Sequence, residues 1–148
     1  MLIATRGSKI DISSEKKTEE IAKKINSEIK PGDTLFLHGE IGVGKTTFAK
    51  YLINDFQLKF NESLTEVTSP TFNIMNEYKV SDITIKHYDL YRLKTSKELD
   101  NLNLFENNNK SILLIEWPNI IEKKPNSLIE LSLEYENDYQ NRFIKILN

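Results

Sequence analysis

The chain contains no cysteine, and this absence excludes disulfide frameworks, thiol catalysis and cysteine-based zinc sites. It has no apolar run that approaches the roughly 18–20 residues of a membrane-spanning helix. Its first residues lack the charged start and the long apolar stretch of a secretory signal. From these absences we expect a cytoplasmic protein that makes no contact with a membrane.

Positive charge is also scarce. Lysine and arginine together number 20 against 22 aspartate and glutamate residues, which gives a formal net charge of -2. The arginines are only Arg6, Arg92 and Arg142. A domain that binds DNA or tRNA by itself usually carries a basic surplus that displaces counterions from the phosphates. The composition therefore disfavours DNA binding and strong direct tRNA binding.

The residues that are present suit one folded domain. Hydrophobic residues make up 39% of the 148 residues and charged residues 28%, proportions that are typical of a globular protein. The length is that of one ordinary domain, and we find neither an internal repeat nor a convincing linker. We therefore expect residues 1–148 to form a single domain.

Hydrophobic periodicity predicts alternating strands and helices. The first strand is expected at residues 2–5 or 9–12, and Ser13 or Ser14 then caps a helix. Further strands are expected at residues 34–38, 72–78, 84–89, 111–116, 127–135 and 142–147, and further helices at 45–56 and at 96–104 with Ser96 as its cap. This order predicts an α/β domain with parallel pairing in the middle of the sheet and antiparallel strands at its edges.

The segment GEIGVGKT at residues 39–46 fits the phosphate-binding pattern G-x-x-x-x-G-K-[ST] at every fixed position. Glycines let successive backbone N–H groups point at phosphate oxygens, and the following helix aims its positive dipole end at the same place. Lys45 supplies a full charge, and Thr46 offers a hydroxyl to Mg²⁺. A predicted buried strand before the motif and a predicted helix after it argue against a chance match. We therefore expect a P-loop NTPase-type three-layer fold that binds nucleotide through Glu40, Ile41, Gly42, Val43, Gly44, Lys45, Thr46 and Thr47.

Two acids are candidates for the metal-linked carboxylate that such a loop requires. Glu116 follows four consecutive apolar residues, and Asp89 ends a strand of alternating pattern. Either acid could instead be a solvated side chain at a strand end. We prefer Glu116 because its strand is the more fully apolar, and we expect Asp89 to orient a water or a metal-bound ligand.

Other polar residues near these acids remain open on sequence alone. Thr71, in the segment SPTF, lies where other P-loop NTPases carry a threonine that senses the γ-phosphate, but an ordinary turn shaped by Pro70 explains it equally well. His87 is expected to have a packing role. Trp117 could be a core residue or an exposed contact, and Arg92 is a candidate for a catalytic arginine.

Four segments occur in order and at close spacing: GEIGVGKTTFAK, TSPTFNIMNEY, HYDLYRL and LLIEW. Together they resemble the bacterial TsaE (YjeE) family, the ATPase of tRNA threonylcarbamoyladenosine biosynthesis, over nearly the whole chain. The resemblance implies an ATP- and Mg²⁺-dependent partner of the threonylcarbamoyl transferase subunit and of that subunit's inactive paralogue. It implies that the chain drives turnover of this complex and meets tRNA only indirectly.

The resemblance also implies roles for single residues. Thr46 with Glu116 would hold Mg²⁺, and Lys45 would act with Glu116 in catalysis. Thr71 matches a switch-like threonine and Asp89 a functional aspartate. Glu15 and Arg142 fall where the family approaches the nucleotide. The family often has GDLGAGKT where this chain has GEIGVGKT, and the differences fall at positions that the phosphates leave free. The family also usually has a glycine near the position of Asn103, and asparagine tolerates left-handed backbone better than most residues.

Three other functions compete with this reading. A small-molecule kinase would need a lid with several arginines over the transferred group, and three dispersed arginines make such a lid hard to build. A GTPase would need the guanine-reading segment Asn-Lys-x-Asp, which the sequence lacks. A binding module that ATP merely gates has the same binding residues and stays open. We expect slow hydrolysis by the chain alone and faster hydrolysis with its partners.

Overall fold

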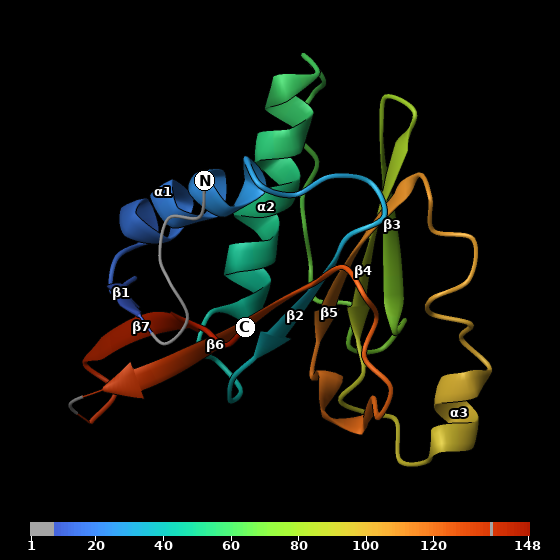
Figure 1. The fold of residues 1–148 in the computed structure, drawn as a ribbon. Coiled ribbons are helices and arrows are strands. Elements are labelled where there is room, and N and C mark those ends of the chain that lie inside the picture. The colour runs from blue at the N-terminus through green and yellow to red at the C-terminus, as the bar shows by residue number, and fades with distance from the viewer. Residues whose placement is uncertain (1–7, 137) are drawn as a thin grey trace.

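The computed structural model describes residues 8–136 and 138–148. These residues form a seven-stranded sheet in the order β1-β7-β6-β2-β5-β4-β3 (Figure 1). The strands are β1 (Lys9–Asp11), β2 (Thr34–His38), β3 (Met75–Val80), β4 (Ile83–Asp89), β5 (Ser111–Glu116), β6 (Leu128–Glu136) and β7 (Asn141–Ile146).

The centre of the sheet is parallel and its edges are antiparallel. Strand β2 pairs in parallel with β5 and β6, and β5 pairs in parallel with β4. The pairs β1–β7, β6–β7 and β3–β4 are antiparallel. Every residue of β5 is buried, as expected for a parallel strand that is covered on both faces. The predicted mixed α/β sheet is thereby confirmed.

Two helices, α1 (Glu15–Asn26) and α2 (Lys45–Lys59), cover one face of the sheet and pack against each other (Figure 1). Phe48, Leu52 and Ile53 of α2 are completely or almost completely buried in this layer. The hydroxyl of Ser14 accepts a hydrogen bond from the Lys17 N–H and caps α1. Of the two predicted caps, Ser14 is therefore the correct one.

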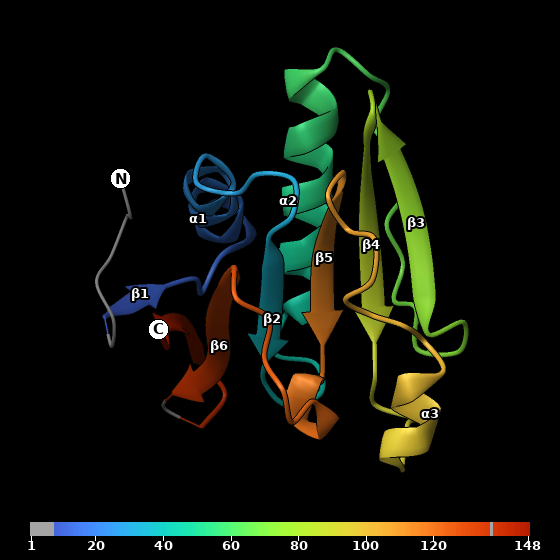
Figure 2. The same ribbon diagram turned by 45° about the vertical axis from the view of Figure 1, so that its right-hand side comes forward.

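The opposite face is covered mainly by loops, with the short helix α3 (Ser96–Asp100) and the 3₁₀ turn η1 (Pro118–Ile120) (Figure 2). Leu90, Leu104 and Ile121 from these segments form a buried cluster with Phe36 of β2 and Leu113 of β5. The third layer of the predicted architecture is thus present, but helices make up only a small part of it.

The predicted helix at residues 96–104 is wrong in its cap and its length. Thr95, not Ser96, is the N-cap, and it forms a reciprocal capping box with Glu98. Two satisfied donors favour this start over a lone serine. The helix ends at Asp100, and Asn103 has a φ of 50°, a left-handed conformation that a helix cannot contain.

The strand predicted at residues 72–78 begins later, at Met75. The preceding residues form a turn in which the Ile74 N–H donates to the Pro70 carbonyl oxygen at 2.6 Å. Ile74 has a φ of 69°, and a left-handed backbone costs a non-glycine residue about 1–3 kcal/mol. This turn is held in place because the Ile74 carbonyl accepts from the Asp89 N–H at 2.9 Å.

The remaining boundaries agree with prediction to within a few residues. Helix α2 continues to Lys59 rather than ending near Phe56. Strand β1 matches the alternative at residues 9–12, while residues 2–5 lie outside the described ranges. Within residues 8–136 and 138–148, no helix combines the length and the apolar character that crossing a membrane requires.

Candidate functional site

The carboxyl ends of β2, β4 and β5 meet the N-terminus of α2 at one edge of the sheet (Figure 2). Ligands of open α/β sheets bind at this edge, and a cavity of about 360 Å³ lies there. We call it the main cavity. The predicted site residues that line it are Ile41, Gly42, Gly44, Lys45, Thr46, Thr47, Thr71, Asp89 and Glu116.

The phosphate loop, residues 39–47, joins the end of β2 to the start of α2. Gly39 has a φ of 149°, and a Cβ atom there would lie 2.7 Å from the Leu133 carbonyl oxygen of β6. Gly42 is braced from the same strand, because the Tyr135 hydroxyl donates to its carbonyl oxygen at 2.7 Å. The loop therefore owes its shape to close contact with β6 as well as to its glycines.

The N-terminus of α2 differs from those of the other two helices. Ser14 caps α1 and Thr95 caps α3, but the N-cap of α2 is Gly44, which has no side chain to donate or accept. No acidic residue lies in the first turn of α2. The first amide N–H groups of a helix have no intrahelical acceptor, so α2 directs these donors and its positive dipole end into the main cavity. This is the arrangement that binds phosphate groups.

Lys45 lies at the centre of the site. Its side chain is buried, and its Nζ donates to the carbonyl oxygens of Gly39 at 2.5 Å and of Glu40 at 2.9 Å. The ammonium also lies 4.3 Å from the centre of the Trp117 ring. Burial lowers the pKa of Lys45, and the nearby carboxylates, with that of Glu116 foremost, only partly oppose this shift. Burial therefore disfavours the charged form of Lys45, and a phosphate group beside the ammonium would favour it.

Glu116 connects the phosphate loop to β4. The Thr46 hydroxyl lies 3.2 Å from Glu116 Oε1 and 3.0 Å from Oε2, and His87 Nε2 lies 2.6 Å from Oε2. His87 is completely buried, so its packing role is accompanied by a contact that the sequence did not predict. Since both partners donate, the carboxylate accepts from two sides and has a fixed orientation.

Asp89 forms a second polar cluster beside the first. The Thr71 hydroxyl donates to Asp89 Oδ2 at 2.9 Å, and the Tyr91 N–H donates to Oδ1 at 2.9 Å. The Ser69 and Thr71 hydroxyls are 2.6 Å apart. Asp89 is paired directly with Glu116 in the register of β4 and β5. The segment that contains Thr71 is therefore both a turn and part of the candidate site.

A smaller cavity of about 220 Å³, the side cavity, lies on the other side of the phosphate loop. Glu15 from α1 and Arg142 from β7 both line it, together with Val43. Gly44 and Thr47 line the side cavity and the main cavity alike, so the two cavities adjoin across these residues. The structure thus brings Glu15 and Arg142 to the phosphate loop, although they lie at opposite ends of the sequence.

The polar groups of the site suit a magnesium ion better than a metal held by the protein alone. In the described part of the chain, no group of three or more histidine, cysteine, aspartate or glutamate residues could enclose a metal. The Thr46 hydroxyl and the Glu116 carboxylate form a two-residue oxygen donor set. Mg²⁺ is usually bound by one or two such groups together with phosphate oxygens and waters.

Some residues of the site were not predicted from sequence, and one residue predicted to belong to it lies outside it. Ser69, Tyr91 and Trp117 line the main cavity, and Trp117 has a left-handed φ of 56° that turns the chain directly after Glu116. Arg92 donates to the Phe72 carbonyl oxygen at 3.2 Å instead of lining the main cavity. Ser69, Tyr91 and Trp117 each belong to a segment that carries the family resemblance, and these segments were the signal that could have identified them.

Known proteins resemble the chain over most of its length. The family model described as threonylcarbamoyl adenosine biosynthesis protein TsaE matches residues 12–144. The tRNA threonylcarbamoyladenosine biosynthesis protein TsaE of Rickettsia conorii is 42% identical over 83% of this chain and 69% of its own length. The protein of the same name from Rickettsia bellii is 39% identical over 93% of this chain and 92% of its own length.

The fold has a solved relative as well. The crystal structure of Bacillus subtilis YdiB superposes with a TM-score of 0.70 and 27% sequence identity, covering 97% of this chain and 86% of that one. The family match spans the phosphate loop, both acids and the strands β2, β4 and β5 that position them. The chain therefore belongs to the TsaE family of threonylcarbamoyladenosine biosynthesis proteins.

Proposed function

We propose that the chain is the ATP-binding and slowly ATP-hydrolysing subunit of the bacterial machinery that forms N6-threonylcarbamoyladenosine next to the tRNA anticodon. It acts with the threonylcarbamoyl transferase subunit and its inactive paralogue, and drives their turnover in the cytoplasm. The observation that carries this proposal is the uncapped N-terminus of α2, which opens into the main cavity and carries Thr46 within hydrogen-bond distance of Glu116. The net charge of -2 agrees with a protein that reaches tRNA through its partners.

The two adjoining cavities suggest how ATP lies in the site. The phosphates occupy the main cavity, where the first amides of α2 and Lys45 offer donors. The nucleoside crosses Gly44 and Thr47 into the side cavity. There Glu15 and Arg142 supply a carboxylate and a guanidinium that can hydrogen-bond to the base or the ribose.

Thr46 and Glu116 would hold the magnesium ion, which neutralises charge on the bound phosphates. Because the Thr46 hydroxyl directs its hydrogen at Glu116, its lone pairs are free to face the cavity. Asp89, held by Thr71 and the Tyr91 N–H, is the group that orients the attacking water. Thr71 is positioned to respond when a γ-phosphate arrives.

Slow hydrolysis follows from the scarcity of positive charge. Among the described residues that line the main cavity, Lys45 alone is cationic. Phosphoryl transfer is faster when a further cation, often an arginine from a partner protein, stabilises the transition state. The same scarcity speaks against a small-molecule kinase, which needs several such groups in one lid.

The test is ATP hydrolysis by the chain with and without the transferase subunit and its paralogue. Wild type is expected to be stimulated, and Lys45→Ala and Glu116→Gln to lose about 100-fold or more of the stimulated rate, because each removes charge stabilisation from the reacting phosphate. Lys59→Ala, at the exposed far end of the same helix, is the matched control. If the partners do not stimulate ATP hydrolysis by the wild-type chain, the proposed role in their complex is contradicted.

A gated binding module is the second candidate, and the lack of a lining arginine favours it over any faster enzyme. A non-hydrolysable ATP analogue separates the two functions. If the analogue supports repeated turnover of the transferase as well as ATP does, nucleotide binding is the essential activity and hydrolysis is incidental.

A further inference from the structure

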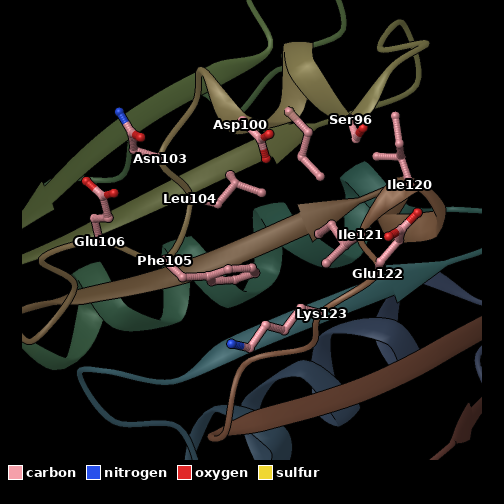
Figure 3. A pocket seen from close by; sticks show the side chains of 11 residues that line it. Ser96, Asp100, Asn103, Leu104, Phe105, Glu106, Ile120, Ile121, Glu122 and Lys123 are labelled. Carbon is pink, nitrogen blue, oxygen red and sulfur yellow. The ribbon is translucent and has the colours of Figure 1, made fainter.

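A larger cavity lies on the sheet face opposite α1 and α2, outside the proposed nucleotide site. It has a volume of about 540 Å³, and we call it the α3 cavity. One wall is α3 with the loop after it, and the other is residues 120–123 (Figure 3). Leu99, Leu104, Phe105, Ile120 and Ile121 give it an apolar lining, and Phe105 remains 40% exposed. The cavity is therefore an apolar depression that is open to a visiting side chain.

The rim of the α3 cavity is acidic. Asp100, Glu106 and Glu122 lie on it against the single cation Lys123 (Figure 3). Each of the three carboxylates is exposed, and none forms an ion pair with any side chain of the described ranges. Unpaired carboxylates around an apolar centre are complementary to an apolar side chain flanked by basic ones. Exposed rim charges suit the long side chains of a protein segment better than a small polar ligand, which would need buried polar groups to orient it.

Both walls of the cavity are continuous with the candidate site. Leu90 directly follows Asp89 and leads to α3, while η1 begins two residues after Glu116. The two segments are joined at their start, because the Leu90 N–H donates to the Glu116 carbonyl oxygen at 3.1 Å. They meet again in the buried cluster that contains Leu104 and Ile121. A molecule that moves one wall against the other therefore pulls on the backbone that carries both acids.

We propose that the α3 cavity is a docking site for a protein segment with an apolar side chain flanked by lysine or arginine. We assign that segment to the partner that accelerates ATP hydrolysis, and this second assignment rests on the proposed function. The apolar side chain packs against the exposed Phe105 over the cavity floor, and the basic side chains pair with the rim. Docking then reaches Asp89 and Glu116 through the two walls.

The first experiment tests the chemistry without any natural partner. A short synthetic peptide, with leucine and phenylalanine flanked on both sides by lysines, is titrated into the ¹⁵N-labelled chain. Amide shifts are expected to concentrate at residues 99–106 and 120–123. Glu106→Lys with Glu122→Lys should weaken binding about tenfold or more, because like charges then face each other. Phe105→Ser should weaken it as well, since the apolar contact is lost.

The matched control carries the same change of net charge elsewhere. Glu20→Lys with Asp82→Lys places two lysines at exposed positions on α1 and in the β3–β4 turn. This variant is expected to bind the peptide within about twofold of wild type after allowance for the altered net charge. Shifts scattered over the surface, or equal losses in the rim variant and the control, would overturn the proposal.

The second experiment uses the transferase subunit and its paralogue. The rim variant should keep the ATP affinity of the isolated chain and lose stimulation of hydrolysis by the partners, while the control keeps both. If the partners stimulate the rim variant as strongly as wild type, the assignment of the docked segment to them is wrong although the proposed function stands. If the peptide maps to the cavity but the partners do not stimulate wild type, the docking site stands and the proposed function fails.

Discussion

The imidazole of His87 has no exposed surface, and its Nε2 lies 2.6 Å from Glu116 Oε2. Because the carboxylate accepts, Nε2 carries the hydrogen and Nδ1 is left as an acceptor. Nδ1 is buried and has no hydrogen-bond partner among residues 8–136 and 138–148. An apolar side chain of similar shape would avoid the cost of this unpaired nitrogen. The hydrogen bond to Glu116, rather than packing, therefore explains a histidine at this position.

At this residue we predict that His87→Leu weakens binding of ATP with Mg²⁺ about tenfold, because a hydrogen bond to a charged group contributes about 1.5–3 kcal/mol. His87→Gln, whose amide can donate from a position close to Nε2, should recover most of the affinity. Calorimetric titrations with and without Mg²⁺ check this, since ATP binding without the ion should change little. If the leucine and glutamine variants bind alike, the histidine acts through packing.

A ¹⁵N spectrum of the imidazoles provides a check that does not depend on binding. The chain has two histidines, so His38 serves as an internal comparison. We expect the His87 signal to show hydrogen on Nε2 and none on Nδ1. The reverse tautomer would contradict the geometry on which the affinity prediction depends.

The sequence predicted the strands that carry His87 and Glu116 but not the contact between these two residues. Strand alternation places His87 and Asp89 on the same face of β4, and the apolar run before Glu116 marks a buried strand. The register that sets Asp89 beside Glu116 and His87 beside Leu114 comes from the pairing of β4 with β5. His87 and Glu116 are 29 positions apart, and local pattern carries no information on the register that brings them together.

At the scale of elements, the phosphate loop packs so closely against β6 that position 39 has no room for a side chain. We predict that Gly39→Ala destabilises the protein by at least about 1 kcal/mol more than Gly32→Ala. Both residues have positive φ values, but a Cβ at position 39 meets the Leu133 carbonyl at 2.7 Å, whereas nothing lies within 4 Å of one at position 32. Urea unfolding of both variants measures the difference.

The ATP affinities of the same two variants show whether the crowding at position 39 also disturbs the nucleotide site. Gly32→Ala should bind ATP as wild type does, because it lies outside the site, while Gly39→Ala should bind it more weakly because β6 displaces the loop. Equal ATP affinities would mean that the loop absorbs the added atom without moving the phosphate donors.

The elements themselves were predictable where their determinants are local. Strands β2 and β5 are short apolar runs, and their predicted bounds match the observed ones. The phosphate loop lies between a strand and a helix as its motif requires. Helix α3 was misplaced because Thr95 and Ser96 compete as caps, and the side-chain geometry of Glu98 decides between them. The start of β3 was missed because a left-handed isoleucine is rare enough that no pattern predicts it.

For the molecule as a whole, we predict that the free energy of unfolding falls in acid and that protonation of Glu130 accounts for part of this fall. Glu130 of β6 accepts hydrogen bonds from His38 at 2.8 Å and from Lys124 at 3.1 Å. Burial acts to raise the pKa of Glu130, but these two partners outweigh it and leave the pKa below that of an ordinary glutamate. The ionised carboxylate thus stabilises the folded state above the pKa of the unfolded chain, near 4.3.

This stabilisation should disappear as the pH falls through the lowered pKa of the folded state. Glu130→Gln is expected to be less stable than wild type at pH 7, and the difference should shrink once the pH falls below about 4. Urea unfolding over this range measures both effects. A difference that stays constant with pH would show that the two partners do not depend on the charge of Glu130.

Lys45 donates to two carbonyl oxygens of its own loop and lies against Trp117. On the proposed function, a phosphate would therefore enter the site by exchange, because it would replace acceptors that the ammonium already has. If the loop keeps this shape when nucleotide binds, little ordering entropy would oppose nucleotide capture. On release of the product, the same two carbonyl oxygens would again accept from the ammonium, and the loop would not have to refold.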